Sequence, residues 1–269
     1  MKILILIPVG FLVGIIGTLM GAGGGFLLMP FMMVYFSNKT PKELTSISMI
    51  SIFFNSLSGT YAYLKMKRVE LQTAFLFSLI IIPGSIAGTI ITNHINRERY
   101  NLIFGIFLIF ITLFLLFFKR IEQNEKNFSN FLKTCYIKDG FDNEFKFSYN
   151  LLTGLILSFI VGFLSPIFGI GGGVLHVPFM IKLLCFPPHI ATATSHFVLM
   201  VMSFVSVLTH ILSGIDKFIL LNSFFLILGI IPGAQIGAKL SKKVKDEFLL
   251  YFLSVALFIV AVRILLLKN

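Results

Sequence analysis

The chain has 269 residues, of which 57% are hydrophobic and only 12% carry a charged side chain. This composition excludes a soluble globular domain, because too few charged residues remain to cover its surface. The formal net charge of +11 does not indicate nucleic-acid binding, since the basic residues stand at the ends of apolar runs, as in membrane proteins. We therefore predict a polytopic protein of the lipid bilayer with no nucleic-acid partner.

Apolar runs of eighteen or more residues recur along the chain. They are continuous rather than alternating, so they predict membrane-spanning helices and not the strands of a barrel. The predicted fold class is an all-α polytopic membrane protein with about eight spans, one for each run. The expected spans are 3–36, 44–64, 73–92 and 100–118, followed by 149–186, 191–212, 218–238 and 247–266.

The two halves of the chain read as copies of one unit. Residues 11–33 are FLVGIIGTLMGAGGGFLLMPFMM and residues 159–181 are FIVGFLSPIFGIGGGVLHVPFMI, with eleven of the twenty-three positions identical without a gap. The predicted organisation is therefore repeat 1 over 1–120, a polar linker over 121–148 and repeat 2 over 149–269. Further aligned pairs are Thr45 with Thr192, Ser48 with Ser195, Pro83 with Pro232, Gly84 with Gly233 and Gly88 with Gly237.

The first run of each repeat is too long for one upright crossing. A helix over 3–36 would span roughly 50 Å, against a hydrocarbon core of roughly 30 Å. The chain either crosses and partly re-enters, which makes the repeats parallel, or forms a hairpin of two short helices, which makes them inverted. The inverted arrangement places 14 of the 22 basic residues on the side of the linker, and the parallel one places 13 there. We favour inverted repeats with a cytoplasmic linker.

Each over-long run contains a cluster of glycines followed by a short apolar segment with a proline. Consecutive glycines inside lipid indicate an unwound turn that faces protein or a water-filled cavity. The helix after such a turn starts with unpaired N–H groups and a partial positive charge, which form an anion site without a basic side chain. Close helix packing is the alternative role of these glycines. The candidates are Gly21, Gly23, Gly24, Gly25, Gly169, Gly171, Gly172 and Gly173.

Polar side chains within the spans are the other binding candidates. The histidines either bind an anion or move protons, or else hold helices together as neutral groups, and the asparagine has a similar structural alternative. We expect no carboxylate at mid-membrane depth, hence no carboxylate proton relay, and no metal or cofactor. The acidic residues at span ends or in loops are Glu43, Glu70, Glu98, Asp216, Asp246 and Glu247. The candidate side chains are Ser48, Asn55, Thr194, Ser195, His176 and His196.

The two glycine clusters share the pattern G-x-G-G-G-x-L-x-x-P-x-M, and each is followed by a span that opens on small hydroxyl residues. In these features the chain resembles the TauE/SafE sulfite-exporter family of membrane transporters, over everything except the linker. The family's second motif, a small residue followed by Thr-Ser, is complete in residues 191–195, but only its final serine is kept in residues 44–48. The resemblance implies export or uptake of small sulfur-containing or organic anions.

The sequence predicts a secondary transporter that moves small anions, such as sulfite, sulfonates or related organic anions, across the inner (plasma) membrane. The substrate is expected at the paired glycine breaks, and a homo-oligomer is compatible with the sequence. No enzymatic activity is predicted, because no cluster of histidine, cysteine and acidic ligands occurs within the spans. An anion channel with the same site and a membrane scaffold without transport are the alternatives.

Overall fold

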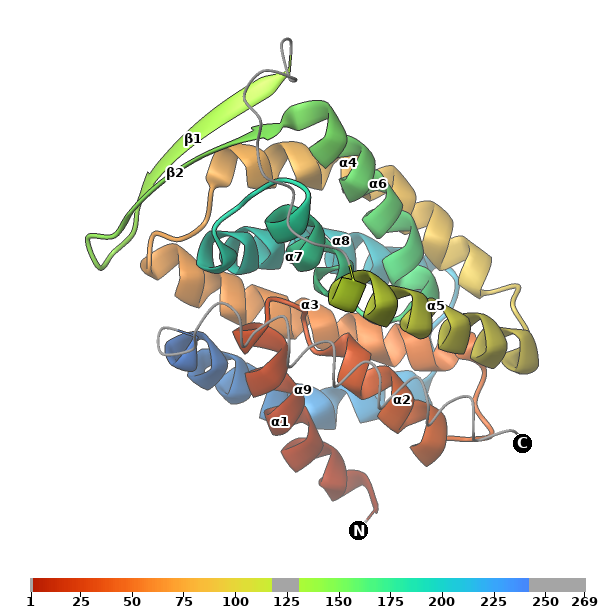
Figure 1. Cartoon of the computed structure of the whole chain (residues 1–269). Helices are drawn as coiled ribbons and strands as arrows, with labels where there is room; N and C mark the ends of the chain where they lie inside the picture. The colour runs from red at the N-terminus through yellow and green to blue at the C-terminus, as the bar shows by residue number, and fades with distance from the viewer. Residues whose placement is uncertain (1, 118–130, 242–269) are drawn as a thin grey trace.

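The computed structural model describes residues 2–117 and 131–241, which form a helical bundle with a two-stranded hairpin at one end (Figure 1). In chain order the elements are a 3-10 helix η1 (Lys2–Ile5), α1 (Leu6–Leu19), α2 (Gly25–Tyr35), α3 (Pro41–Lys65), α4 (Leu71–Thr92), α5 (Arg97–Phe117), β1 (Leu132–Lys138), β2 (Glu144–Asn150), α6 (Leu151–Phe168), α7 (Gly173–Lys182), α8 (Pro188–Leu212) and α9 (Lys217–Leu240).

The helices fall close to the predicted spans. Four of those described, α4, α6, α8 and α9, are long and apolar enough to cross a membrane, and η1 with α1, α2 and α7 are shorter apolar helices. α3 and α5 occupy the predicted spans 44–64 and 100–118. The last predicted span, 247–266, lies outside the described residues. The chain is therefore a mostly helical protein with the apolar helices of a polytopic membrane protein.

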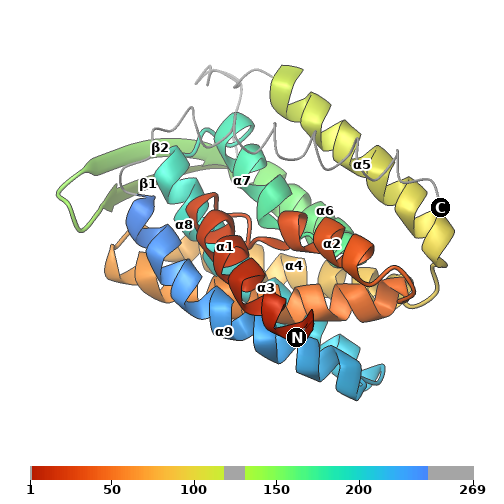
Figure 2. The ribbon, with the colours of Figure 1, turned by 90° about the horizontal axis from the view of Figure 1, so that it is seen from below.

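Each over-long run is broken into two helices at its glycine cluster. The first run separates into α1 and α2 around residues 20–24, and the second into α6 and α7 around residues 169–172. The chain reverses direction at both breaks, as two perpendicular views show (Figures 1 and 2). α2 has 11 residues and α7 has 10, so each is about 15 Å long, half the thickness of the hydrocarbon core. The chain thus turns back at both breaks, but the expected pair of short helices is found only at the first, because α6 is itself as long as a membrane span.

The all-α prediction is wrong for the polar linker, which contains a β-hairpin. β1 and β2 pair antiparallel, with Leu132 opposite Asn150 at their open end. Both strands are rich in aromatic and β-branched residues at alternating positions, which favours a strand over a helix. The buried side of the hairpin packs on the bundle, where the ring centroids of Phe147 and Phe186 are 4.4 Å apart. The predicted boundary at residue 149 falls inside β2, and the second helical half begins at Leu151.

α1 and α9 pack with their backbones in close contact through glycines. A Cβ atom on Gly229 would lie 2.0 Å from the carbonyl oxygen of Ile7, and one on Gly237 would lie 2.3 Å from that of Ile15. Because both residue numbers rise together along the contact, the two helices run parallel. Small residues are what allow membrane helices to approach so closely.

The same kind of contact joins α4 to α6. A Cβ atom on Gly84 would lie 2.8 Å from the carbonyl oxygen of Phe159, and one on Gly88 would lie 2.2 Å from that of Phe163. These two helices are therefore also parallel. Close helix packing is thus the role of glycines in the helices themselves, in addition to any role of the glycines at the breaks.

α3 and α8 cross at the centre of the bundle in opposite directions. The hydroxyl oxygens of Ser56 and Ser203 lie 3.5 Å apart, and further along α3 Gly59 faces His196, which is earlier in α8. α1, α3 and α9 run toward the end of the bundle that carries the β-hairpin, while α4, α6 and α8 run away from it (Figure 1). We call this end the hairpin end, and the opposite end, with the starts of α3 and α9, the far end.

Candidate functional site

The two glycine turns, residues 20–24 and 169–172, are buried and touch each other. A Cβ atom on Gly25 would lie 2.5 Å from the carbonyl carbon of Ile170, and one on Gly173 would lie 2.6 Å from the Cα atom of Ala22. The contacts are reciprocal, because Gly25 aligns with Gly173 and Ala22 with Ile170 in the two halves. Neither glycine has room for a side chain, so the breaks meet backbone to backbone.

Five of the eight candidate glycines have a backbone conformation that other residues avoid. Their φ angles are positive, so a Cβ atom would be strained whatever the surrounding space. These are Gly21, Gly23, Gly24, Gly169 and Gly171, with φ of 70°, 72°, 79°, 63° and 76°. The remaining three, Gly25, Gly172 and Gly173, do not have positive φ, and at Gly25 and Gly173 the close backbone contact explains the glycine.

The helices that follow the turns begin at this contact. In α2 the N–H of Leu28 donates to the carbonyl of Gly24 at 3.1 Å, and in α7 the N–H of His176 donates to the carbonyl of Gly172 at 2.7 Å. The N–H groups of Leu27 and Leu175 donate to the same two carbonyls at 3.1 Å, so the N–H groups at the very start of each helix are the ones that the helix geometry leaves without an intrahelical partner and with a partial positive charge. Two positive helix ends therefore converge in the bundle, an arrangement that favours an anion.

Each turn lies against the start of a helix from the other half of the chain. The hydroxyl of Ser48 in α3 donates a hydrogen bond to the carbonyl of Gly169, and the Cγ2 atom of Thr45 lies 3.1 Å from a Cβ atom placed on Gly169. In the equivalent contact, the Cγ2 atom of Thr192 in α8 lies 2.9 Å from a Cβ atom placed on Gly21. The structure thus brings Ser48 to a glycine turn, but to the turn of the other half.

Several polar atoms near the turns are buried without a hydrogen-bond partner in the described part of the chain. Asn55 Oδ1 accepts a hydrogen bond from Thr18 Oγ1 at 2.8 Å, whereas Asn55 Nδ2 is unpaired. A Cβ atom placed on Gly17 would lie 2.8 Å from this Nδ2 and 2.3 Å from the backbone N of Gly24, so the amide lies beside the first turn. An unpaired buried polar group costs about 1–3 kcal/mol, which a polar ligand would recover. Thr192 Oγ1, whose side chain lies beside Gly21, is also unpaired, as is Ser195 Oγ in the same helix, whereas the ring of His196 faces the backbone of Gly21.

His196 reaches from α8 to the first half of the chain. Its ring meets that of Tyr63 edge-on, with 5.5 Å between centroids, and its Nε2 would lie 2.8 Å from a Cβ atom on Gly59. Tyr63 donates from its hydroxyl to the carbonyl of Thr18 at 2.8 Å. Sequence reasoning missed Thr18, Gly59 and Tyr63. The available signal was the four-residue spacing of Asn55, Gly59 and Tyr63, which puts them on one face of α3.

Two further candidates are engaged with other helices. His176 Nε2 and Ser158 Oγ are 3.1 Å apart, and the His176 ring meets that of Phe77 edge-on at 5.5 Å. The hydroxyl of Thr194 accepts a hydrogen bond at 3.0 Å from the N–H of Glu70, at the start of α4. His176 is therefore held between α6 and α4, and Thr194 supports a helix start rather than a glycine turn.

The acidic residues of the described membrane helices stand at helix starts. Glu43 and Glu98 lie in the first turns of α3 and α5, while Glu70 and Asp216 are the N-cap residues of α4 and α9. Positions 246 and 247 lie outside the described residues. Within residues 2–117 and 131–241, no three His, Cys, Asp or Glu side chains are grouped so that they could hold a metal ion.

Residues 6–264 match the protein family described as Sulfite exporter TauE/SafE. The chain is 31% identical over 271 residues to the probable membrane transporter protein YunE of Bacillus subtilis (strain 168), with 98% of each chain covered. It is 27% identical over 274 residues to a probable membrane transporter protein of Methanocaldococcus jannaschii, with 97% of this chain and 95% of the relative covered. No solved structure gives a significant match. The match along nearly the whole chain shows that the protein belongs to the sulfite exporter TauE/SafE family of membrane transporters.

Proposed function

We propose that the protein is a secondary transporter of small anions, such as sulfite, sulfonates or related organic anions, in the inner (plasma) membrane. The substrate binds where the two glycine turns meet. The observation that carries the proposal is that the starts of α2 and α7 meet at the glycine turns, beside the unpaired Asn55 Nδ2 and Thr192 Oγ1 and without a carboxylate among the contacts given for these turns. The family name and the names of the two relatives support transport as the activity.

The donors at this place suit the oxygen atoms of an anion. The starts of α2 and α7 offer backbone N–H groups after Gly24 and Gly172, Asn55 offers Nδ2, and Ser195 offers a hydroxyl. Hydrogen bonds and helix-end charge hold an oxyanion without a fixed cation. Binding by neutral donors is weak enough for the ion to leave again, which transport requires.

We also infer that the two halves are inverted repeats. α1 and α3 point toward the hairpin end, whereas their sequence counterparts α6 and α8 point away from it, and α4 and α9 differ in the same way (Figure 1). Opposite directions of equivalent helices support inverted repeats and argue against parallel ones. The basic residues around the linker then support a cytoplasmic hairpin end.

Inverted halves provide two rigid groups of helices for alternating access, one built on α1 and α9 and the other on α4 and α6, which we call arms. Glycine contacts join α1 to α9 and α4 to α6, so each arm contains helices from both repeats. The arms meet along α3 and α8, where small hydroxyl side chains such as Ser56 and Ser203 face each other. When the two arms rock about this seam, the site at the glycine turns opens to one end of the bundle and closes to the other.

Flux by the purified full-length protein in sealed liposomes tests the proposal. Radiolabelled sulfite, a sulfonate and a carboxylate are offered separately, with and without a proton or sodium gradient, and protein-free liposomes are the control. Accumulation of one anion above its equilibrium level supports a secondary transporter. Very fast flux that runs only downhill favours the anion channel. Absence of flux for every anion in the panel contradicts the proposal and favours the scaffold.

A further inference from the structure

A cavity of about 450 Å³ lies at the far end of the bundle. Its walls come from the loop between α2 and α3, the end of α4 and the start of α5. Cavities of this size are large enough for small ligands. The polar side chains in its lining include Asn38, Lys39, Lys42, Asn93, Asn96 and Arg97.

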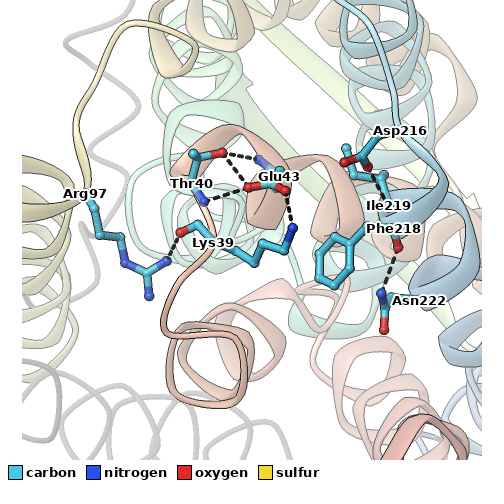
Figure 3. Close-up of polar contacts among 8 residues, drawn as sticks. All are labelled: Lys39, Thr40, Glu43, Arg97, Asp216, Phe218, Ile219 and Asn222. Atoms are coloured by element: carbon cyan, nitrogen blue, oxygen red, sulfur yellow. Dashed lines mark hydrogen bonds and ion pairs between the residues drawn. The ribbon is translucent and has the colours of Figure 1, made fainter.

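Lys39, the first of three cations in the lining, is neutralised locally. Its ammonium pairs with Glu43 at 2.7 Å and lies 4.0 Å from the ring centroid of Phe218 (Figure 3). Glu43 also accepts hydrogen bonds from the N–H and the hydroxyl of Thr40, which caps α3. The start of α3 is therefore already capped by the chain's own carboxylate and is not itself the ligand site.

Arg97 and Lys42 carry charges that no carboxylate among the described residues balances. Arg97 donates to the carbonyl oxygens of Lys39 at 2.6 Å and Met33 at 2.8 Å, and Lys42 donates to that of Ser213 at 2.6 Å. Carbonyl oxygens orient these side chains but leave their full positive charges. The lining contains three cations and no carboxylate, and of the three only Lys39 is paired, with Glu43 outside the lining, so the cavity has an excess of positive charge that attracts anions.

A line of buried polar groups leads from the cavity into the bundle along α8. Ser213, whose carbonyl binds Lys42, follows the last turn of α8, and His210 in that turn has both ring nitrogens buried and unpaired in the described structure. Deeper in the helix, the hydroxyl of Ser206 lies 2.8 Å from a hydroxyl of α4, and that of Ser203 lies 3.5 Å from one of α3. Beside Ser203, the sulfur of Met202 lies 3.2 Å from a Cβ atom placed on Gly172, so this part of α8 reaches the second glycine turn.

We propose that this cavity is an oxyanion-binding site and the station at which the transported ion is held at the far end of the bundle. Its ligand is a small oxyanion of sulfur or phosphorus, bound by Arg97 and Lys42 with donors from the neighbouring asparagines. The role as a transport station rests on the proposed function, whereas the binding itself does not. The phosphate of an anionic phospholipid has the same chemistry, so a lipid headgroup is the second source of such a ligand.

Equilibrium binding of radiolabelled sulfate to the full-length protein in neutral detergent tests the site. Asn38 has no side-chain hydrogen bond among the described residues, so Asn38→Asp adds a negative charge without removing a contact. We expect Asn38→Asp and Lys42→Gln each to weaken sulfate binding about tenfold. Lys217→Gln removes an exposed charge from the same end outside the lining, and it keeps wild-type affinity. No sulfate binding by the wild type, or equal affinity in all four proteins, overturns the proposal.

Changing the lipid around the protein shows whether the ligand is a free ion or a lipid headgroup. Sulfate binding is measured in nanodiscs of phosphatidylcholine alone and in nanodiscs with phosphatidylglycerol added. Equal binding in both supports a free ion as the occupant. Competition by phosphatidylglycerol that disappears in Asn38→Asp assigns the cavity to a lipid headgroup and overturns its role as a transport station.

Flux measurements on the same variants distinguish a wrong assignment of this cavity from a wrong proposed function. With the anion that the wild type carries, we expect Asn38→Asp to raise the KM about tenfold and Lys217→Gln to leave it unchanged. An unchanged KM in Asn38→Asp contradicts the role of the cavity in transport but leaves the proposed transport function intact. If the wild type binds sulfate but transports no anion, the proposed transport function is contradicted and the binding site is still supported.

Discussion

The hydroxyl oxygens of Ser56 and Ser203 lie 3.5 Å apart where α3 and α8 cross, and the two residues are 147 positions apart in the chain. The same offset aligns Thr45 with Thr192, so Ser56 meets its own counterpart from the other half. Contact between counterparts is expected at a two-fold axis that relates two copies. It supports the inverted arrangement proposed above and marks the seam about which we expect the two arms to move.

The neighbouring glycines Gly172 and Gly173 are expected to respond differently to alanine. In Gly173→Ala the new Cβ atom would lie 1.9 Å from the carbonyl oxygen of Gly21, a backbone atom that has no room to move. In Gly172→Ala it meets only side chains, Val161 at 2.9 Å and Met202 at 3.2 Å, and φ is −59°. We expect a loss of about 3 kcal/mol of stability and of all flux for Gly173→Ala, and about 1 kcal/mol for Gly172→Ala. Thermal unfolding in detergent and liposome flux measure both, and equal stability of the two variants would contradict the contact between the turns.

Ser48→Ala and Ser195→Ala remove aligned hydroxyls with different expected results. Ser48 donates to the carbonyl of Gly169, so its loss leaves a buried acceptor unpaired and costs about 1 kcal/mol in stability. Ser195 Oγ is buried without a partner in the described structure, so alanine leaves stability unchanged or higher. If Ser195 binds the substrate, Ser195→Ala raises the KM for flux about tenfold. A normal KM in this variant would remove Ser195 from the binding site.

The two membrane histidines can be assigned to ligand binding or helix packing by the same comparison. His176 forms a hydrogen bond with Ser158. His176→Leu leaves the buried Ser158 hydroxyl without this partner, so it lowers the free energy of unfolding by about 1–2 kcal/mol. His196 makes no side-chain hydrogen bond among the described residues and its ring faces the backbone of Gly21, so His196→Leu is expected to cost less stability than His176→Leu while it lowers flux. Circular dichroism melting and flux test this expectation. A destabilised His196→Leu protein with normal flux would assign His196 to packing instead.

The hairpin is held to the loop between α3 and α4 by a buried ion pair whose carboxylate makes it acid-sensitive. Arg68 Nε and Asp139 Oδ2 are 3.1 Å apart, and both side chains are nearly inaccessible. Burial raises the pKa of Asp139, but hydrogen bonds from Asn143, from the N–H of Phe141 and from Arg68 outweigh it, so the pKa lies below the ordinary value of 3.8. A lowered pKa means that the stabilisation is present above pH 3.8 and is lost as the pH falls through the folded value.

We therefore expect amide hydrogen exchange in β1 and β2 to accelerate only in strong acid, below about pH 4. Asp139→Asn should weaken the docking of the hairpin by about 1–3 kcal/mol at neutral pH and remove this acid dependence. Lys138→Gln breaks the exposed pair with Asp142 instead, and it should leave exchange unchanged. Exchange in Asp139→Asn that still accelerates in acid would place the titrating group elsewhere.

Local patterns in the sequence were sufficient for several features of the site. The positive φ angles of Gly21 and Gly169 follow from glycines interrupting an apolar run, and the turns follow from a run too long for one crossing. The β-hairpin was missed because its charged residues masked a strand pattern in which Phe147 faces the bundle. The basic cavity was missed because Lys42 and Arg97 are 55 positions apart and meet only when α3 and α5 start at the same end.

The sequence alone determined that this protein lies in a membrane and that glycines break two of its apolar runs, and it predicted that the two halves are copies of one unit. These properties depend on composition and on spacing along the chain, which act locally. Only the tertiary structure decided that Ser48 contacts the turn of the other half, that Thr194 binds the start of α4 and that His196 packs on Tyr63. Such contacts join distant residues, and they are set by the directions in which the helices pack and by the close approach that their glycines permit.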